Sequence, residues 1–237
     1  FPYSVTDDGE VRELSFDEFS GLYPKAGQYL ERHKKLICDN VEVLPSKNKN
    51  YNTTEHWHLY TRANNHGAIY QKICVPMTAQ YTQAAVVLDK HIYCDNANMF
   101  FIQIPDVDET RLYALSAIIN STIFNTLARS IANPQRGGYF KFNKQFLDPV
   151  PVPREAFVEC SKEITKLAGI AKRIEKTNEQ IRINAGGKVS GLQISLKSLW
   201  SQLDLLCDKL YGITSPNDKG LIYSVIRKDR NPYGQEN

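Results

Sequence analysis

The chain has 237 residues, of which 42% are hydrophobic and 23% charged; this is the composition of a globular protein and excludes a disordered or collagen-like chain. The 29 Lys and Arg residues nearly balance the 26 Asp and Glu residues, so net charge alone does not indicate a nucleic-acid-binding protein. No apolar run approaches the roughly 20 residues of a membrane-spanning helix, and we expect no membrane association. Because the chain begins with Phe1 rather than Met, we expect it to be part of a longer protein.

Two short helices are predicted near the N-terminus. Ser15 followed by Glu18 is the pattern of a capping box, and it predicts a helix within residues 14–23. Apolar and aromatic residues at helical spacing predict a second helix over 27–37, after a turn at Pro24. The polar segment 45–56 lacks any periodicity and is predicted to be an exposed loop.

Four segments in the middle of the chain are short and rich in Val, Ile, Tyr and Phe. Turn-forming Asn, Gly and Pro residues separate them, which is the pattern of strands. We expect these segments to form one small mixed sheet: 57–62, 68–76, 84–94 and 98–104.

Residues 108–131 repeat apolar residues at helical spacing and begin with acidic residues, so they predict a single long helix that stops near Asn133-Pro134. The following residues, 135–153, combine glycines, bases, alternating aromatics and a Pro-x-Pro ending. They predict a loop, a short strand and an exit linker, with a domain boundary at 148–153.

Two heptad-like seams follow the linker. The first comprises Phe157, Cys160, Ile164, Leu167, Ala171, Ile174, Asn178 and Ile181, and the second comprises Leu196, Leu199, Leu203, Leu206, Leu210 and Ile213. The glycine-containing loop 185–191 between them predicts an antiparallel, coiled-coil-like helical pair. The seams could pack within their own chain or could bind another chain or domain. The expected fold is therefore α+β, with a recognition domain over 1–153 and a helical hairpin with a C-terminal tail over 154–237.

The five cysteines are widely spaced, odd in number and without a Cys-x-x-Cys pair, so we expect no disulfide framework and a cytoplasmic location. His56 and His58, with His66 and Cys74 further along, lack the usual spacing of zinc ligands, and no metal site is predicted.

Residues 132–135 (Ala-Asn-Pro-Gln) lack the second proline and the aromatic of the Asn-Pro-Pro-aromatic loop of amino methyltransferases. No strand is followed by a glycine-rich cofactor loop, so no catalytic residue is predicted in this chain.

The residue types support nucleic-acid binding better than they support metal binding or catalysis. Residues 129–144 contain four bases and no acid: Arg129, Arg136, Lys141 and Lys144. Lys and Arg hold phosphates, Arg, Asn and Gln fit base edges, and glycines allow a close approach of the backbone. A solvated polar loop is the alternative interpretation. The candidate DNA-binding residues are Trp57, Arg62, Asn64, Lys72, Arg136, Gly137, Gly138, Tyr139, Lys141, Asn143 and Lys144.

A series of motifs occurs in a characteristic order along the chain: FPYS at 1–4 with YPKAGQYLERHKKLI at 23–37, Trp57 with Thr61-Arg62 and Gln71-Lys72-Ile73, LYALSAIINS at 112–121, GGYFKFNKQFL at 137–147 with VPVP at 150–153, and LYGIT at 210–214. In this order they resemble the TaqI-like C-terminal specificity domain. That domain is the target-recognition part of adenine-specific DNA methyltransferases and of fused type II (type IIG) restriction-modification enzymes.

The resemblance implies a sequence-specific DNA-recognition module without activity of its own. Double-stranded DNA and the catalytic methyltransferase domain of the parent enzyme are the implied partners. The parent is expected to methylate adenine N6 with S-adenosylmethionine after base flipping, and it could carry a fused endonuclease. The heptad seams keep an alternative open, in which the helical pair is a protein-interaction or scaffolding element that binds a partner or a second copy.

Overall fold

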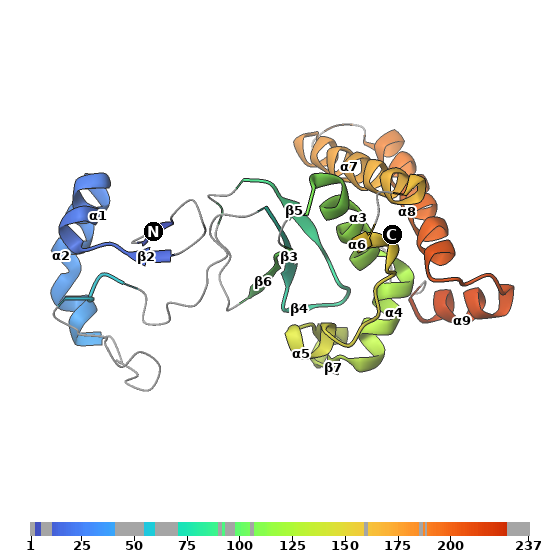
Figure 1. Ribbon diagram of the computed structural model, residues 1–237, viewed down its shortest axis with the longest axis horizontal. Coiled ribbons are helices and arrows are strands. Elements are labelled where there is room, and N and C mark those ends of the chain that lie inside the picture. Colours follow the sequence, from blue (N-terminus) through green and yellow to red (C-terminus); the bar gives the residue numbers. More distant parts are fainter. Residues whose placement is uncertain are drawn as a thin grey trace. The chain divides into compact units, whose positions relative to one another are not determined.

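The computed structural model describes residues 3–5, 11–40, 55–59, 71–89, 92, 98–104, 107–158, 161–184, 187 and 189–226. The chain forms two compact units (Figure 1). Unit 1 comprises 1–70 with 90–93, and unit 2 comprises 71–89 with 94–237. Helices and antiparallel strands occur in segregated blocks, so the fold is α+β as predicted. No described helix combines the length and the apolar character needed to cross a membrane.

Unit 1 contains a two-stranded sheet and two helices. Strand β1 (Tyr3–Val5) pairs antiparallel with β2 (Val11–Glu13), and α1 (Phe16–Leu22) leads into α2 (Pro24–Asn40). The predicted capping box is confirmed, because the Glu18 amide donates to Ser15 Oγ at 3.2 Å and the Ser15 amide donates to Glu18 Oε2 at 2.9 Å. Pro24 begins α2 instead of forming a separate turn; proline suits the first helical position, where an amide donor is not needed.

Unit 2 contains two three-stranded antiparallel sheets. In the first, β3 (Lys72–Pro76) lies between β5 (Ala85–Val87) and β6 (Met99–Ile102). In the second, β8 (Phe140–Lys141) lies between β4 (Thr78–Ala79) and β7 (Asn133–Pro134). Three of the predicted strand segments, 68–76, 84–94 and 98–104, thus contribute to one sheet as expected, although its described pairings are antiparallel instead of mixed. The second sheet lies outside these segments.

The strand predicted over 57–62 is also not formed where the structure describes it. Residues 55–59 make turns, and 60–62 lie outside the described residues. The aromatic residue and histidines that suggested a strand are packed in unit 1 instead, with Trp57 4.7 Å from Phe16 between ring centroids.

The helix predicted over 108–131 is divided in two. Helices α3 (Glu109–Asn120) and α4 (Thr122–Ile131) meet at Ser121, whose backbone is extended (φ −69°, ψ 155°). Ser121 Oγ accepts a hydrogen bond from the Phe124 amide at 3.2 Å and so caps α4. The apolar spacing continues through this serine, and for that reason the periodicity alone concealed the break.

Helix α3 forms the centre of the core of unit 2. Residues 112–119 are all buried, and α3 packs against α7 (Lys162–Ile183), against β5 and against β3. Because this helix is covered on all sides, its sequence is apolar all round instead of amphipathic.

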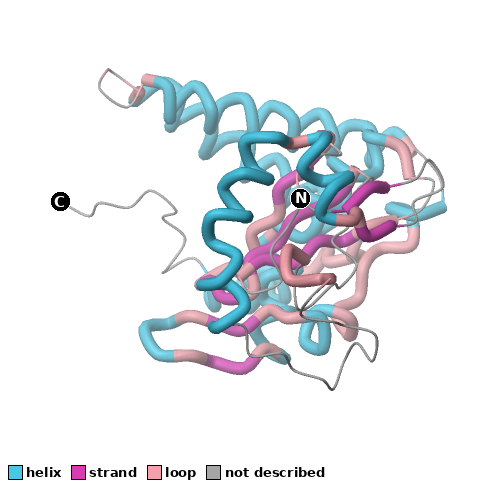
Figure 2. Tube along the Cα trace, turned by 90° about the vertical axis from the view of Figure 1, so that its left-hand side faces the viewer, coloured by secondary structure: helices cyan, strands magenta, loops and turns pink. Residues whose placement is uncertain are grey.

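The predicted helical pair is present. Helix α7 lies alongside α8 (Ser190–Leu210), and the short connection makes the two antiparallel neighbours (Figures 1 and 2). The seam residues Leu199 and Leu203 are 2% and 1% exposed, so this stripe packs within the chain. The stripe therefore gives no support to the alternative of a docking surface for another protein. Cys160 of the first seam lies outside the described residues.

The segment that joins the second sheet to the helical pair is bonded to the end of α8. It contains α5 (Lys144–Leu147) and α6 (Glu155–Val158), and Tyr211 Oη at the end of α8 donates to the Pro151 carbonyl at 2.9 Å. Burial raises the pKa of Tyr211 above its ordinary value, which keeps this hydroxyl protonated. The division into functional domains at residue 153 stays a prediction.

The C-terminal region contains a helix that the sequence prediction missed. Helix α9 (Pro216–Ile226) packs on α4 within the region described as a tail. Tyr223 Oη donates to Asp208 Oδ2 at 3.2 Å, and the Lys219 ammonium lies 3.4 Å from the same oxygen. A serine followed by proline at 215–216 is a start signal for this helix.

Candidate nucleic-acid interface

The acid-free basic segment of unit 2 contains a β-hairpin, the β7–β8 hairpin, which consists of residues 133–141. Lys141 in the central strand β8 is paired with Asn133 on one side and with Thr78 on the other. The Gln135 amide donates to the Tyr139 carbonyl at 2.7 Å and closes the hairpin below its tip. Strand β4 therefore supports the hairpin along β8, and β7 is at the edge of the second sheet.

The hairpin tip is formed by Arg136, Gly137 and Gly138 in a short 3-10 turn. Gly137 has φ +75° and Gly138 has φ +76°, which is the left-handed region where a side chain is disfavoured. A Cβ atom added at Gly138 would meet no atom within 4 Å. Glycine is thus required here by the backbone conformation, and it leaves the peptide groups open to close approach by a ligand.

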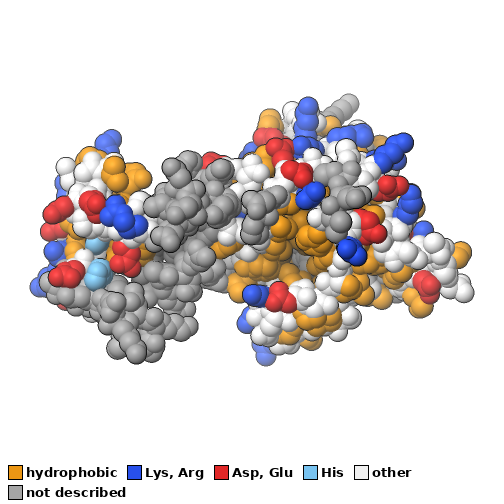
Figure 3. All heavy atoms as spheres, viewed as in Figure 1, with side chains coloured by type: hydrophobic (Ala, Val, Ile, Leu, Met, Phe, Trp, Pro, Cys, Tyr) orange, Lys and Arg blue, Asp and Glu red, His pale blue; other side chains and the backbone are white. Residues whose placement is uncertain are grey.

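Positive charge is exposed along the hairpin and just after it. Arg136, Lys141 and Lys144 are exposed, and the Tyr139 ring is 45% exposed. Figure 3 shows Lys and Arg side chains at the end of unit 2 where Figure 1 labels α5. Residues 129–144 contain no acid, so the hairpin and the start of α5 contribute only positive charge to this surface.

The hairpin is anchored at its C-terminal end by Phe142, which is fully buried. The Phe142 amide donates to the Met77 carbonyl at 2.7 Å, and its ring lies 6.1 Å from that of Phe140, centroid to centroid. Asn143 follows as the N-cap of α5 and is half-buried, with no cap hydrogen bond from its side chain. Asn143 therefore offers less surface to a ligand than its neighbours in sequence do.

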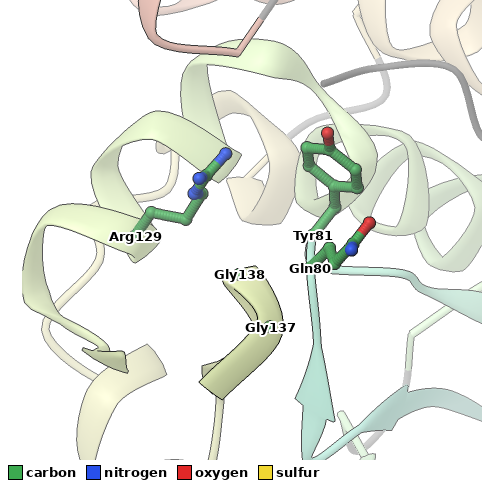
Figure 4. Close-up of a pocket in the computed structure, with 5 residues that line it drawn as sticks. All are labelled: Gln80, Tyr81, Arg129, Gly137 and Gly138. Atoms are coloured by element: carbon green, nitrogen blue, oxygen red, sulfur yellow. The ribbon is translucent and has the colours of Figure 1, made fainter. Parts of the chain in front are cut away.

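A pocket of about 410 Å³ lies between the hairpin tip, α4 and the loop after β4 (Figure 4). It is lined by Gln80, Tyr81, Arg129, Gly137 and Gly138. The Arg129 guanidinium carbon is 4.5 Å from the centroid of the Phe140 ring and 5.6 Å from that of Tyr81. Gln80, Tyr81 and Arg129 were not among the predicted site residues, although Arg129 belongs to the acid-free basic stretch.

The loop that carries Gln80 and Tyr81 is fixed to the core by buried hydrogen bonds. The Thr82 amide donates to Asn125 Oδ1 at 2.7 Å, and Thr82 Oγ1 donates to the Ile119 carbonyl at 2.6 Å. Asn120 exchanges hydrogen bonds with the backbone of Ala84, at 2.9 and 2.7 Å. Because these bonds attach the loop to α3 and α4, the wall of the pocket is built on rigid elements.

The structure brings together only part of the predicted site. The residues from 136 to 144 share one hairpin and the start of α5. Lys72 is fully buried in the central strand β3, and Trp57 is 4% exposed in unit 1, where the Lys34 ammonium lies 4.9 Å from its ring centroid. Each of these two side chains offers little surface, and their DNA contacts stay a prediction. Arg62 and Asn64 lie outside the described residues.

His56 and His58 both lie in unit 1. Within the described ranges no group of three or more His, Cys, Asp or Glu side chains is placed to hold a metal ion. His56 Nε2 instead lies 4.0 Å from Glu13 Oε2, and His58 Nε2 lies 2.8 Å from the Leu14 carbonyl oxygen. Their described contacts are thus made within unit 1.

The family model described as the TaqI-like C-terminal specificity domain matches residues 28–152, which is more than half of the chain. The matched segment includes the β7–β8 hairpin, the pocket residues and α5. No curated protein matches the sequence.

Proposed function

The chain belongs to the TaqI-like C-terminal specificity domain family, and we propose that it recognises double-stranded DNA through the β7–β8 hairpin and the start of α5. The observation that carries this proposal is the exposed, acid-free hairpin with its glycine tip, which lies inside the matched segment. Its Lys and Arg side chains suit phosphates, and a projecting hairpin can enter the major groove.

The positions of the charged residues indicate different roles for the two lysines and for Arg136. Lys141 and Lys144 lie at the base of the hairpin and are proposed to hold phosphates, because an ammonium is a point charge without a preferred binding plane. Arg136 lies at the tip, where its planar guanidinium can reach base edges. Tyr139, exposed beside it, is proposed to pack against the nucleotide that Arg136 contacts.

We further propose that the parent enzyme is a restriction-modification methyltransferase. In that enzyme this chain would place the target adenine for N6 methylation by a catalytic domain outside the sequence given. Gly137 and Gly138 form the tip of an antiparallel hairpin, whereas a glycine-rich cofactor loop joins a strand to a helix. The loop therefore does not fit S-adenosylmethionine, and we assign that cofactor to the rest of the parent enzyme.

The double substitution Lys141→Ala/Lys144→Ala should weaken binding to all duplex sequences alike. The intact chain is expected to bind duplex DNA nonspecifically with Kd of about 10⁻⁴–10⁻⁶ M, and each lost phosphate contact should reduce the slope of log K against log salt by about 0.9. Fluorescence anisotropy with a labelled duplex at several salt concentrations measures both quantities. Lys166→Ala/Lys176→Ala, which removes two exposed lysines of α7, is the matched control. Equal losses in the two variants would contradict the placement of the interface on the hairpin.

Arg136→Ala should change sequence preference more than general affinity. Loss of a bidentate contact to a base edge lowers discrimination at one base pair by about 1–3 kcal/mol. Selection from randomised duplexes by the intact chain and by the variant would show which position becomes degenerate. An unchanged selected motif, or a uniform loss like that of the lysine variant, would remove Arg136 from the reading role.

A further inference from the structure

Arg129 lies on a different element from the hairpin, yet its side chain reaches the hairpin's pocket. It belongs to the last turn of α4, and Figure 4 shows it extending from that helix toward the space opposite Gln80 and Tyr81, with Gly137 and Gly138 along one side. Among the described residues that line the pocket there is no carboxylate, and Arg129 is the one charged side chain.

The guanidinium of Arg129 is held by two aromatic rings from separate parts of the chain. Phe140 comes from β8 and Tyr81 from the loop after β4, and the ring centroids lie 4.5 and 5.6 Å from the guanidinium carbon. Stacking of this kind restrains the guanidinium at the wall of the pocket. Less rotamer entropy is then lost when an anion binds.

We infer that this pocket binds a phosphate of the DNA backbone, held by Arg129 beside the glycine tip. The inference rests on the proposed function of the hairpin and assigns it a further contact residue. A guanidinium fork matches two phosphate oxygens, and Gly137 and Gly138 have no side chains to keep the phosphate away from the backbone. Gln80, on the opposite wall, adds a neutral hydrogen-bond donor.

A phosphate fits this position better than a base edge does. Arg129 is half-buried and lies behind the hairpin tip. Phosphates project from the surface of the duplex, whereas the edges of paired bases lie at the floor of a groove about 8.5 Å deep. If the tip enters the groove, a phosphate at the groove wall can reach the pocket, while the paired bases stay beyond the reach of a side chain held against two rings.

Three substitutions in the intact chain separate the charge of Arg129 from its stacking. Arg129→Gln should weaken binding to every duplex about tenfold and lower the salt slope by about 1, because a phosphate contact is lost. Arg129→Lys should keep the salt slope but lose most of that affinity. Phe140→Leu keeps the arginine and removes one ring, so it should lower affinity severalfold without changing the slope. Circular dichroism melts establish that each variant is folded at the assay temperature.

The outcomes distinguish this inference from the proposed function. Unchanged affinity and slope in Arg129→Gln, with a loss in Lys141→Ala/Lys144→Ala, would overturn the phosphate pocket and leave the hairpin interface in place. A loss confined to particular sequences would make Arg129 a base reader and would also overturn the inference. If neither variant affected binding, both the pocket and the hairpin interface would be wrong.

Discussion

Phe142→Ala is expected to lower the free energy of unfolding by about 3–5 kcal/mol, the usual range for a phenylalanine removed from a core. The side chain is fully buried, it packs in the core of unit 2, and its amide is bonded to Met77. Its removal leaves a cavity at the point where the hairpin joins the core. Urea unfolding followed by circular dichroism measures the change. DNA binding by the surviving folded fraction should also fall, because the hairpin loses its anchor.

Two further variants make this expectation specific. Phe157→Ala removes the same side chain from a position that is 46% exposed, and it should change the free energy of unfolding by less than about 1 kcal/mol. Phe142→Leu preserves most of the volume and should cost less than about 1.5 kcal/mol. Similar losses for the two alanine variants would show that Phe142 does not anchor the hairpin.

Asp204→Ala is expected to lower the free energy of unfolding by about 3 kcal/mol, because two buried donors would lose a charged acceptor. Asp204 projects from α8, is 8% exposed, and accepts hydrogen bonds from the amide and the hydroxyl of Thr122, both at 2.8 Å. Thr122 is the first residue of α4, so the carboxylate also interacts favourably with the dipole of that helix.

The Asp204 contact can be isolated by a double-mutant cycle with Thr122→Val, which removes the hydroxyl and keeps the amide. A coupling energy of about 0.5–3 kcal/mol between the two substitutions is expected from chemical denaturation. Asp204→Asn keeps one acceptor, so it should lower the free energy of unfolding by less than Asp204→Ala does. Asp218→Ala is the control, because Asp218 is exposed in the first turn of α9. It should lower the free energy of unfolding by less than about 1 kcal/mol. Additivity of Asp204→Ala and Thr122→Val would show that the bond between the hydroxyl and the carboxylate contributes nothing to stability. A loss for Asp204→Ala no larger than that for Asp218→Ala would show that the carboxylate does not support α4.

Helices could be predicted from the sequence where local chemistry alone determines them. The capping pair Ser15 and Glu18 and the apolar spacing of α7 and α8 are local signals, and the predicted helices are present. The division at Ser121 depends instead on tertiary contacts, because the buried Asp204 carboxylate supports the new helix start from a distant part of the chain. Helix α9 carried only a serine–proline start signal and a weak apolar pattern, so it was missed.

The candidate site was predictable to the extent that it is continuous in sequence. The Lys, Arg and Gly residues of the hairpin occur in one continuous basic segment, and that segment could be identified from its residue types. Lys72 appeared to be an available cation, but β3 is a central strand, and its strand position buries the side chain. Arg129 could not be related to Tyr81 or Phe140, because the distance between side chains on separate elements is not encoded in spacing along the chain.

The way in which the hairpin is supported has a consequence for the evolution of sequence preference. Its frame, made by β4, β8, the Gln135–Tyr139 bond and Phe142, ends before residues 136–138. Residue types at the tip can therefore be exchanged without disturbing the core, provided that each replacement tolerates the left-handed backbone at positions 137 and 138. If the tip contacts base edges as proposed, mutation can retarget such a domain in small steps that keep it folded. A laboratory library confined to positions 136 and 139 would explore new recognition sequences from a stable scaffold.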